Sequence, residues 1–593
     1  MKKLTLLFIC CTITCTVFSQ TKILTLEQFG AKADGVVAAD GDIAAGSNVL
    51  ESNSANFTTA DIGKIIFVAG ALKNGNTLIG IISAVNSKTS VTISAPATAN
   101  ANSTGITYGT DCTDAFIKFN KAARIYKNVV LNMKPGTYLT KFNNYLAGIK
   151  NITLNGNGCN LICTRGAYDP LIFARANVGL FMPSCYDNVD NNYFINNEPG
   201  NTSFGYKIQS TSKATRSVQT ISNTDAVSFK PGNWVFVYGL HHEDFGGWPP
   251  NPFYFEYAKV KSVDYSTGKI YLDRPLNSAY DAGWPDGKGR GGIGAARIIN
   301  LNRDNFTTIE NLNINNINFA PFNGWNGKLS NDQRNSRIEL YGFIYGKITN
   351  VTAAAAYFGQ GKKLVVDHVN ITGGCEPDKG LDTCIIKNSK ITQLINAGGL
   401  HYLFLLNNTF YGGFNSSPLN LYINGNTFVN TTGTTTQSLA AFGFNQATNY
   451  IEIGTNTWDC SNGKRTFLIS PTSTVTMTVG AVVDTDVITI PYDTFVSAHN
   501  SRRIIPGASG STASGKTFRV KRVYQYDANN IAVSGTCTNG QPVKGDAYIF
   551  QMAPKIKITG KQLKVGASKG KYALFQRLSP ANNLELADKS FSF

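Results

Sequence analysis

The sequence predicts an all-β fold: a right-handed parallel β-helix that carries small β-barrel-like insertions and an N-terminal capping helix. Three observations support this prediction. Short apolar alternations repeat through the middle of the chain, asparagine recurs at the corners between them, and compact β modules interrupt the repeat.

The repeat has a period near 19 residues. Successive alternations end at Phe319, Ala353, Ile371, Ile391, Phe410, Phe428 and Trp458. Four of the six steps between these residues are 18–20 residues long, and the two longer steps hold loops at 320–336 and 430–450. Such a period is too short for helical repeats or propeller blades, and it matches one coil of a parallel β-helix.

Asparagine marks the corner that follows many of the alternations. The residues concerned are Asn350, Asn370, Asn388, Asn408 and Asn426. The short amide side chain tolerates the left-handed backbone conformation and can form hydrogen bonds from coil to coil. We therefore expect an asparagine ladder along the solenoid.

The composition of the N-terminal residues predicts where the protein is located. Residues 1–19 predict a secretory signal peptide, because basic residues precede a short apolar core and Val17 and Ser19 occupy cleavage-site positions. The mature protein is thus expected to be secreted, extracellular or periplasmic. No later run approaches the roughly 20 apolar residues of a membrane-spanning helix, so no integral membrane segment is predicted.

Beyond the signal peptide, residues 20–470 predict the β-helix, with β insertions at about 40–105 and 220–280. Residues 471–593 predict a C-terminal β-rich module, which could bind a ligand or form a trimer contact. The sequence is therefore compatible with either a monomer or a trimer.

Eight cysteines remain after removal of the signal peptide. They are Cys112, Cys159, Cys163, Cys185, Cys375, Cys384, Cys460 and Cys537. An even number in an exported chain permits disulfide bonds. The nearest partners are Cys375 with Cys384, and two among Cys159, Cys163 and Cys185.

The net charge of +17 arises from few acidic residues, since only 15% of the residues are charged. A positive field favours a polyanionic partner. Export favours an acidic polysaccharide over nucleic acid, and we expect no nucleic-acid partner. A basic protein without an anionic ligand is the alternative.

The alignment of the repeat also assigns side chains to faces, because strand residues alternate between the core and the exterior. The inward positions are Gly346, Leu364, Cys384, Leu403 and Leu421, with Ile348, Val366, Ile386, Leu405 and Ile423. The outward positions stack as Tyr345, Lys363, Thr383, Tyr402 and Asn420; as Lys347, Val365, Ile385, Phe404 and Tyr422; and as Thr349, Asp367, Lys387, Leu406 and Asn424. Aromatic rings beside ammonium groups suit a sugar chain with carboxylate or sulfate groups. An ordinary exterior sheet, or one covered by loop 320–336, is the alternative.

Candidate site residues follow from this outward face. We assign catalytic roles to His401, Tyr402, Lys363 and Arg337. We assign substrate binding to Lys387, Asp367, Tyr345, Tyr422, Glu339 and Trp248. Arg337 and Glu339 follow the longest loop, and Trp248 ends the polar and aromatic segment that starts at His241.

Metal binding is less defined by the sequence. Glu376, Asp378 and Asp382 offer oxygen ligands for Ca²⁺, although such a segment between two cysteines is more often a tight, disulfide-closed turn. Ca²⁺ is therefore the one cofactor that the sequence suggests, and no metal-binding residue is assigned.

Two segments resemble the start of the secreted pectate-lyase/polygalacturonase-like superfamily of parallel β-helix proteins. Residues 23–35 are similar to its opening strand and Phe-Gly-Ala-x-x-Asp-Gly turn, and residues 110–116 to the segment that begins its capping helix. In this helix Asp111 or Thr113 serves as the N-cap, and Phe116, Phe119 and Ala122 share one face. The chain departs from the family at Cys112 and in the length between the two segments.

The resemblance implies the fold and carries no catalytic residue. Val365–His368 is similar to the Trp-Ile-Asp-His element of pectate lyases, but the Arg-x-Pro-x-x-Arg element that holds their base is absent. The Asn-Thr-Asp, Asp-Asp and Gly-His-Gly elements of polygalacturonases are absent too.

Two mechanisms and one non-catalytic role remain. β-Elimination from a uronate needs a cation for the carboxylate, a base and an acid. Lys363, Lys387 or Arg337 can supply the cation, and His401 and Tyr402 can transfer the protons. Glycoside hydrolysis needs two carboxyl groups, and on the outward face Asp367 stands alone, with Asp382 and Glu339 as partners. We therefore predict a polysaccharide lyase, with a glycoside hydrolase as the alternative and a carbohydrate-binding protein without catalysis as the second alternative.

Overall fold

A computed structural model shows the fold. It describes residues 21–141, 144–146, 149–163, 172–174, 205–239, 254–280, 282, 296–302, 309–320, 337–377, 380–398, 400–411, 414–429, 439–443, 450–459, 467–470, 474–491, 508–527, 529–551, 555–565 and 584–586.

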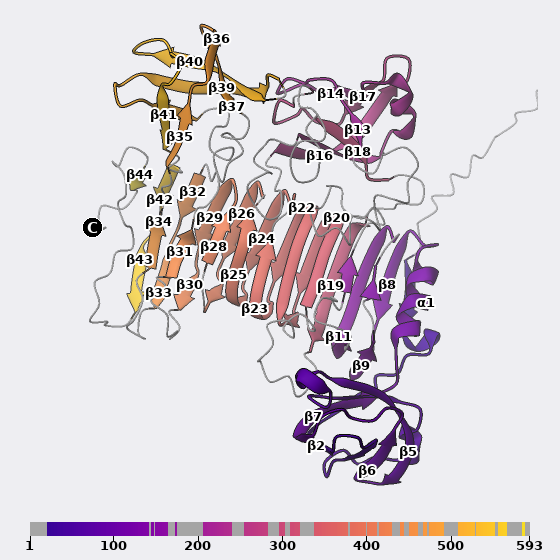
Figure 1. Cartoon of the computed structure of the whole chain (residues 1–593). Coiled ribbons are helices and arrows are strands. Elements are labelled where there is room, and N and C mark those ends of the chain that lie inside the picture. The colour runs from indigo at the N-terminus through magenta and orange to yellow at the C-terminus, as the bar shows by residue number, and fades with distance from the viewer. Residues whose placement is uncertain are drawn as a thin grey trace, which may run out of the picture.

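The centre of the molecule is a solenoid of parallel strands (Figure 1). Each full coil contributes to three strand ladders, which we name sheets A, B and C. Sheet A contains β1 (Lys22–Thr25), β8 (Asn128–Asn132), the first part of β11 (Asn151–Cys163) and of β19 (Ile309–Phe319), the last part of β20 (Arg337–Thr349) and of β22 (Ala355–Asp367), β24 (Thr383–Lys387), β26 (Tyr402–Leu406), β29 (Asn420–Asn424), β32 (Tyr450–Ile453), β42 (Lys555–Ile558) and β44 (Leu584–Leu586).

Sheets B and C follow sheet A around the coil. Sheet B contains β9 (Thr137–Thr140), the ends of β11 and β19, β21 (Thr352–Ala353), the starts of β23 (Asn370–Pro377) and β25 (Lys390–Gly398), β27 (Thr409–Phe410), β30 (Thr427–Val429), β33 (Asn456–Asp459) and β43 (Gln562–Val565). Sheet C contains β10 (Asn144–Tyr145), β12 (Ile172–Ala174), the starts of β20 and β22, the ends of β23 and β25, and β28 (Phe414–Ser417). Beside it, β31 (Leu439–Gly443) pairs with β34 (Phe467–Ser470).

The all-β prediction is confirmed, and so is the predicted register on sheet A. Tyr345 pairs with Lys363, Lys363 with Thr383, and Thr383 with Tyr402, so each coil advances by 18–20 residues. The predicted inward residues are buried, among them Leu364, Cys384 and Leu403 at 0% exposure. Alternation of apolar and polar residues therefore determined which side of each strand faces the core.

Aromatic side chains continue the core along the solenoid. Phe410 stacks on Phe428 at a ring-centroid distance of 5.3 Å, and Phe428 stacks on Trp458 at 4.6 Å. These rings come from successive coils of sheet B. Because the parallel register repeats the same position in each coil, like residues meet like residues and their rings lie nearly parallel.

The asparagine ladder lies at the corner between sheets A and B. Asn408 Nδ2 donates to Asn426 Oδ1 at 3.1 Å, and Asn426 Nδ2 donates to Asn456 Oδ1 at 3.1 Å. The same oxygens accept the backbone N–H groups of Asn408 and Asn426. Ser389 continues the ladder, since its backbone N–H donates to Asn408 Oδ1 at 3.0 Å.

The predicted corner asparagines occupy three positions rather than one. Asn350 and Asn388 take the left-handed conformation, with φ of 53° and 51°, and His368 takes it in the coil between them. Asn408 and Asn426 lie one residue further along the corner and form the buried ladder. Asn370 lies at the start of β23 and is exposed.

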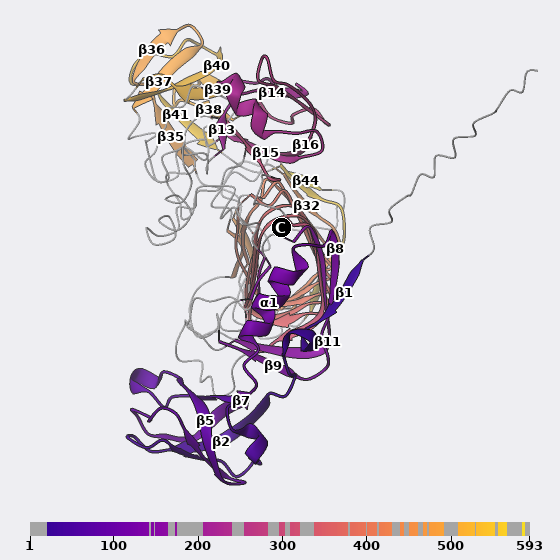
Figure 2. The same ribbon diagram turned by 90° about the vertical axis from the view of Figure 1, so that its right-hand side faces the viewer.

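The capping helix α1 (Thr113–Ala123) covers one end of the solenoid (Figure 2). The predicted N-cap at Asp111 or Thr113 is wrong, because Cys112 occupies the N-cap position and Thr113 is the first helical residue. Asp111 Oδ1 accepts the backbone N–H and the hydroxyl of Thr113 from just outside the helix. Phe116 and Phe119 are buried as predicted, but Ala123 is the buried alanine and Ala122 is only half-buried. The apolar face is thus rotated by one residue at its end.

Three β modules interrupt the solenoid. The first is a closed barrel of β2 (Val36–Ile43), β3 (Val49–Glu51), β4 (Ile65–Val68), β5 (Leu78–Ser87), β6 (Ser90–Ile93) and β7 (Ala101–Gly109). The second is a sheet of β13 (Tyr206–Lys207), β14 (Ser217–Gln219), β15 (Trp234–Gly239), β16 (Tyr254–Asp264), β17 (Lys269–Leu272) and β18 (Arg297–Asn300). The third is a sheet of β35 (Thr474–Thr478), β36 (Ala481–Asp484), β37 (Val487–Pro491), β38 (Ser509–Ser511), β39 (Thr517–Gln525), β40 (Asn530–Thr538) and β41 (Ala547–Gln551). Short 3-10 helices lie at Glu27–Phe29, Thr59–Asp61, Lys73–Gly75 and Asn223–Ser228.

The second and third modules lie on the same side of the solenoid, opposite the first (Figure 1). Both are inserted at equivalent points of a coil. The second module follows β12 and precedes β19, and the third follows β34 and precedes β42. Each therefore interrupts the chain between sheet C and sheet A.

The predicted disulfide between Cys375 and Cys384 is wrong. Both residues carry free thiols and are fully buried. Cys375 points into the core from sheet C and Cys384 from sheet A, where each fills an apolar position. Cys159 is also a free, buried thiol, and Cys163 and Cys185 have no described side chains. Among the described residues, no helix is long and apolar enough to cross a membrane.

Asn426→Ala tests the ladder. The substitution removes the acceptor for Asn408 and leaves the carbonyl of Leu405 without its 2.7 Å amide donor. We expect a loss of about 3 kcal/mol in the free energy of unfolding, because buried polar groups lose their partners. Chemical denaturation measures it. Asn370→Ala, at an exposed position, is the control and should change stability by less than about 0.5 kcal/mol; equal effects of the two substitutions would contradict the ladder's role.

Candidate functional site

The outward face of sheet A holds the predicted columns of side chains. Tyr345 and Tyr402 are 39% and 40% exposed, and Lys363 is exposed in the coil after Tyr345. Phe404 stacks on Tyr422 at 4.6 Å and 10°, and Tyr422 contacts Tyr450 at 5.7 Å. Burial raises the pKa of Tyr422, and the neighbouring Tyr402 and Glu452 raise it further. This face therefore presents aromatic rings and ammonium groups over several coils.

Asp367 and Lys387 pair with each other on this face. Lys387 Nζ lies 3.2 Å from Asp367 Oδ2, and His368 Nδ1 lies 2.7 Å from Oδ1. Asn388 Nδ2 also donates to Oδ1 at 2.9 Å. Burial by itself raises the pKa of Asp367, but the hydrogen bonds from Asn388 and Lys387 and the charge of Lys387 hold it below the usual value. The ion pair between Asp367 and Lys387 thus links two neighbouring coils of the solenoid.

His401 and Tyr402 are adjacent in sequence but have different surroundings. Tyr402 faces outward on sheet A, whereas His401 lies at the corner below the second module. The His401 ring stacks on Phe255 of that module at 4.1 Å and 14°, and its side chain is 15% exposed. Its Nδ1 lies 2.8 Å from Asp382 Oδ1. Because an ionised carboxylate only accepts hydrogen bonds, Nδ1 carries the proton of this contact.

The second module is anchored on the solenoid near this histidine. The buried Tyr257 donates its hydroxyl proton to the carbonyl oxygen of Gly380 at 2.9 Å. Burial raises the pKa of Tyr257, and the charge of Asp382 raises it further. The module therefore covers the corner at which Asp382 and His401 meet.

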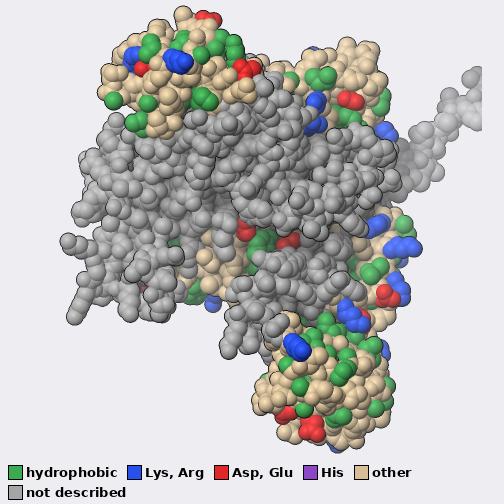
Figure 3. Space-filling model, viewed as in Figure 1, with side chains coloured by type: hydrophobic (Ala, Val, Ile, Leu, Met, Phe, Trp, Pro, Cys, Tyr) green, Lys and Arg blue, Asp and Glu red, His purple; other side chains and the backbone are tan. Residues whose placement is uncertain are grey.

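Glu339 lies on sheet C, not on the face with Asp367. It pairs in register with Tyr357, and Tyr357 pairs with Glu376. All three side chains are half-buried. Two carboxylates are thus two coils apart on one face, with a tyrosine between them. On the face viewed in Figure 3, acidic side chains lie on both sides of a hydrophobic patch near the centre of the solenoid.

Sequence reasoning did not pair Glu376 with Glu339, although a signal was present. Glu339, Tyr357 and Glu376 are 18 and 19 residues apart, which is the period of the repeat. The sequence alignment followed the sheet A strands and left sheet C unassigned. The same period applied to sheet C would have placed the two glutamates in one column.

Several predicted residues lie outside the described side chains. Trp248, His241 and Asp378 lie outside the described residues, as do 321–336 of the predicted covering loop. The backbone of Arg337 pairs with Ala355 on sheet C, and its side chain is not described. No cluster of three or more metal-binding side chains is found within the described part of the chain.

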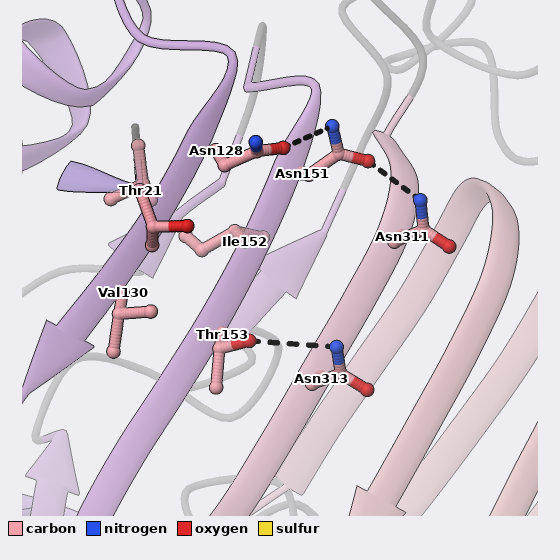
Figure 4. A pocket seen from close by; sticks show the side chains of 9 residues that line it. Thr21, Asn128, Val130, Asn151, Ile152, Thr153, Asn311 and Asn313 are labelled. Carbon is pink, nitrogen blue, oxygen red and sulfur yellow. Dashed lines mark hydrogen bonds between the residues drawn. The ribbon is translucent and has the colours of Figure 1, made fainter. Parts of the chain in front are cut away.

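A cavity of about 350 Å³ lies at the N-terminal end of sheet A (Figure 4). Its lining residues are Thr21, Asn128, Val129, Val130, Asn151, Ile152, Thr153, Asn311 and Asn313. Asn151 Nδ2 donates to Asn128 Oδ1 at 2.9 Å, and Asn311 Nδ2 donates to Asn151 Oδ1 at 2.6 Å. The wall of this cavity therefore includes a second amide ladder and holds no charged group.

Comparison with known proteins gave matches only among solved structures. No protein-family model and no curated protein matches the chain. The similar structures include bacteriophage tailspikes. The tailspike gp61 of Pseudomonas phage phi297 is 12% identical with a TM-score of 0.24 and covers 90% of this chain and 98% of its own. The tailspike gp49 of Pseudomonas phage LKA1 is 12% identical with a TM-score of 0.27, covering 74% and 92%.

A third similar structure is the Gp54 tailspike of Acinetobacter baumannii bacteriophage AP22, which was solved in complex with A. baumannii capsular saccharide. It is 9% identical with a TM-score of 0.24 and covers 75% of this chain and 94% of its own.

Lys387→Met tests whether the Asp367 pair is structural. The substitution removes the ammonium group that lowers the pKa of Asp367, so that pKa should rise toward its usual value of 3.8. A carboxyl with a lowered pKa stabilises the fold above pH 3.8, and this stabilisation is lost as the pH falls through the lowered pKa. We expect a lower melting temperature for the variant at pH 6 and a smaller difference at pH 3, measured by calorimetry. Lys390→Met, at an exposed position of β25, is the matched control; a pH-independent difference for Lys387→Met would contradict this role.

Proposed function

We propose that the protein is an exported right-handed parallel β-helix enzyme that hydrolyses an acidic polysaccharide. The observation that carries the proposal is the column of Glu339, Tyr357 and Glu376 on sheet C. Two parallel-strand spacings separate the Cα atoms of the glutamates by about 10 Å. Inverting glycosidases hold their two carboxyl groups roughly 6.5–9.5 Å apart, which leaves room for a water molecule.

The proposed chemistry uses one protonated and one ionised glutamate. The protonated carboxyl gives its proton to the glycosidic oxygen as the bond to the sugar carbon breaks. The ionised carboxylate takes a proton from water, whose oxygen forms the new bond from the opposite face of the ring. Tyr357, in the coil between the glutamates, offers a ring surface to the sugar that spans them.

The acidic nature of the substrate is supported by charge. The chain carries a net charge of +17, and the successive sheet A strands β20, β22 and β24 carry Lys347, Lys363 and Lys387 at different register positions. Such a field attracts a polyanion and repels a polycation. A polysaccharide with carboxylate or sulfate groups is the polyanion that best suits an exported chain. Export through the signal peptide at 1–19 is itself part of this proposal.

Glu376→Gln and Glu339→Gln test the hydrolase. Each substitution keeps the shape of the side chain but removes its acid–base function, so we expect about a thousandfold loss in kcat, since acid–base groups contribute about 10²–10⁴-fold. Release of reducing ends from alginate, pectate, ulvan and glycosaminoglycans gives the rate. Glu310→Gln is the control, because Glu310 pairs with Lys150 at 3.0 Å and lies on β19 of sheet A. Retained activity in both glutamate variants would reject the hydrolase.

A polysaccharide lyase is the second candidate, and the contact of His401 with Asp382 favours it. A carboxylate that holds Nδ1 fixes the tautomer and the orientation of the ring, as a histidine base requires. Tyr402 follows as the candidate acid, and Lys363 or Arg337 as the cation that neutralises the sugar carboxylate, with Ca²⁺ as an alternative. A carbohydrate-binding role without catalysis is the third reading.

The lyase makes a distinct product. β-Elimination creates an unsaturated uronate that absorbs near 235 nm, whereas hydrolysis creates reducing ends without this absorbance. If the protein is a lyase, His401→Gln and Tyr402→Phe should each lower the rate of absorbance increase by about a hundredfold or more. Asp382→Asn should lower it less, because it disturbs only the orientation of the ring. Unchanged rates in both His401→Gln and Tyr402→Phe would exclude these roles.

A further inference from the structure

Trp234 fills the junction between the second module and sheet A. It begins β15 and is only 3% exposed. Its ring meets the edge of Tyr345, from β20 of the solenoid, at 5.9 Å and 77°. It also belongs to a buried cluster that joins residues of the module to Ile344 of the solenoid. The indole therefore forms a fixed wall where two parts of the chain meet.

Two lysines from different parts of the chain converge on this indole. Lys259 Nζ, from β16 of the module, lies 4.8 Å from the ring centroid. Lys362 Nζ, from β22 of the solenoid, lies 4.7 Å from the same centroid and 5.7 Å from that of Tyr345. Neither lysine has a described carboxylate within ion-pair distance. A tryptophan face attracts one cation, but two ammonium groups beside one ring repel each other.

Arg274 adds a third positive charge to the junction. Its guanidinium lies 3.9 Å from Glu256, but that carboxylate is buried and already accepts the backbone N–H groups of Asn277 and Ser278. Tyr280 donates to Glu256 as well. The nearby Asp273 is exposed and accepts the backbone N–H of Lys259 at 2.9 Å. Glu256 is therefore occupied with structural hydrogen bonds, and Asp273 accepts a backbone N–H of the module.

The junction also holds donors without acceptors. Among the described residues, the buried Nε1 of Trp234 and the buried Nε of Arg274 have no hydrogen-bond partner. Burial lowers the pKa of Lys362, and the charges of Arg274 and Lys259 act in the same direction, against Asp273 and Asp382. Buried donors without partners are costly, and so are like charges in a partly desolvated place. An anion would relieve both.

We propose that Lys259, Lys362 and Arg274, gathered around Trp234, form a subsite for an oxyanion of the sugar chain. The ligand is a carboxylate or sulfate group, because the three cationic side chains are donors and the unpartnered Nε1 of Trp234 and Nε of Arg274 are donors too. Tyr345, which is 39% exposed, offers the adjoining ring surface for the sugar itself. The inference deepens the proposed function, on which it rests: the second module completes the substrate site by supplying half of the anion subsite.

Binding measurements on the full chain test the subsite. We would titrate Glu376→Gln protein, to prevent turnover, with a uronate oligosaccharide, a sulfated dextran oligosaccharide and uncharged dextran, by calorimetry. Lys259→Gln and Lys362→Gln should each weaken binding of an anionic probe by about tenfold, which is the effect of one charge-assisted hydrogen bond. The preference of the Glu376→Gln parent for the uronate or for the sulfated probe identifies the group that is bound.

Lys269→Gln is the matched control. Lys269 lies over the ring of Tyr271 at 5.4 Å in the same module, so its loss removes a cation–π contact of the same kind outside the junction. We expect its affinity to stay within twofold of the parent. Equal affinities for Lys362→Gln and Lys269→Gln would overturn the proposal, and so would equal binding of uncharged dextran or no binding of either anionic probe.

Failure of the subsite and failure of the proposed function give different results. If anionic probes bind through Lys259 and Lys362 but no polysaccharide is cleaved, the subsite proposal is supported and the proposed hydrolase activity is rejected. If the polysaccharide is cleaved through Glu339 and Glu376 but the lysine variants bind normally, the hydrolase activity is supported and the subsite proposal is rejected. Melting temperatures of the lysine variants equal to that of Lys269→Gln would show that the module remains docked.

Discussion

The parallel register between coils is the constraint on which the rest of the structure depends. Each strand of the solenoid satisfies its backbone hydrogen bonds on the coils before and after it, so a shift in one coil would displace all later ones. The buried amides of Asn408, Asn426 and Asn456 hold this register at one corner. The stack of Phe410, Phe428 and Trp458 holds it inside the core.

Because the register is fixed, residues that are one repeat apart in the sequence lie side by side on the surface of the solenoid. Side chains one period apart are neighbours about 5 Å apart, so chemistry that needs two or three groups can draw them from separate coils. Glu339 and Glu376 are brought together in this way, and so are Lys387 and Asp367. The two pairs differ in charge. The glutamates on sheet C carry the same charge, whereas Asp367 and Lys387 on sheet A have opposite charges and form an ion pair.

The insertions make some of these surfaces enclosed. The second module enters between sheets C and A and places Phe255 on His401 and Trp234 on Tyr345. Its contacts span several coils, since Tyr257 also reaches Gly380. A flat solenoid face excludes little water, so a module that covers the corner is needed to strengthen electrostatic contacts with a ligand there.

The sequence by itself determined the coil period, the inward and outward residues of sheet A, the capping helix and the positive charge. These features are local or periodic, and a repeat of apolar strands every 19 residues or so can be read without knowledge of any distant contact. The sequence could not reveal that Cys375 and Cys384 point into the core from two different sheets, or that the His401 ring stacks on Phe255. Only the tertiary structure decided these points and the meeting of Lys259 with Lys362, because the path of an inserted module and the sheet to which a short strand belongs depend on packing between residues far apart in the chain.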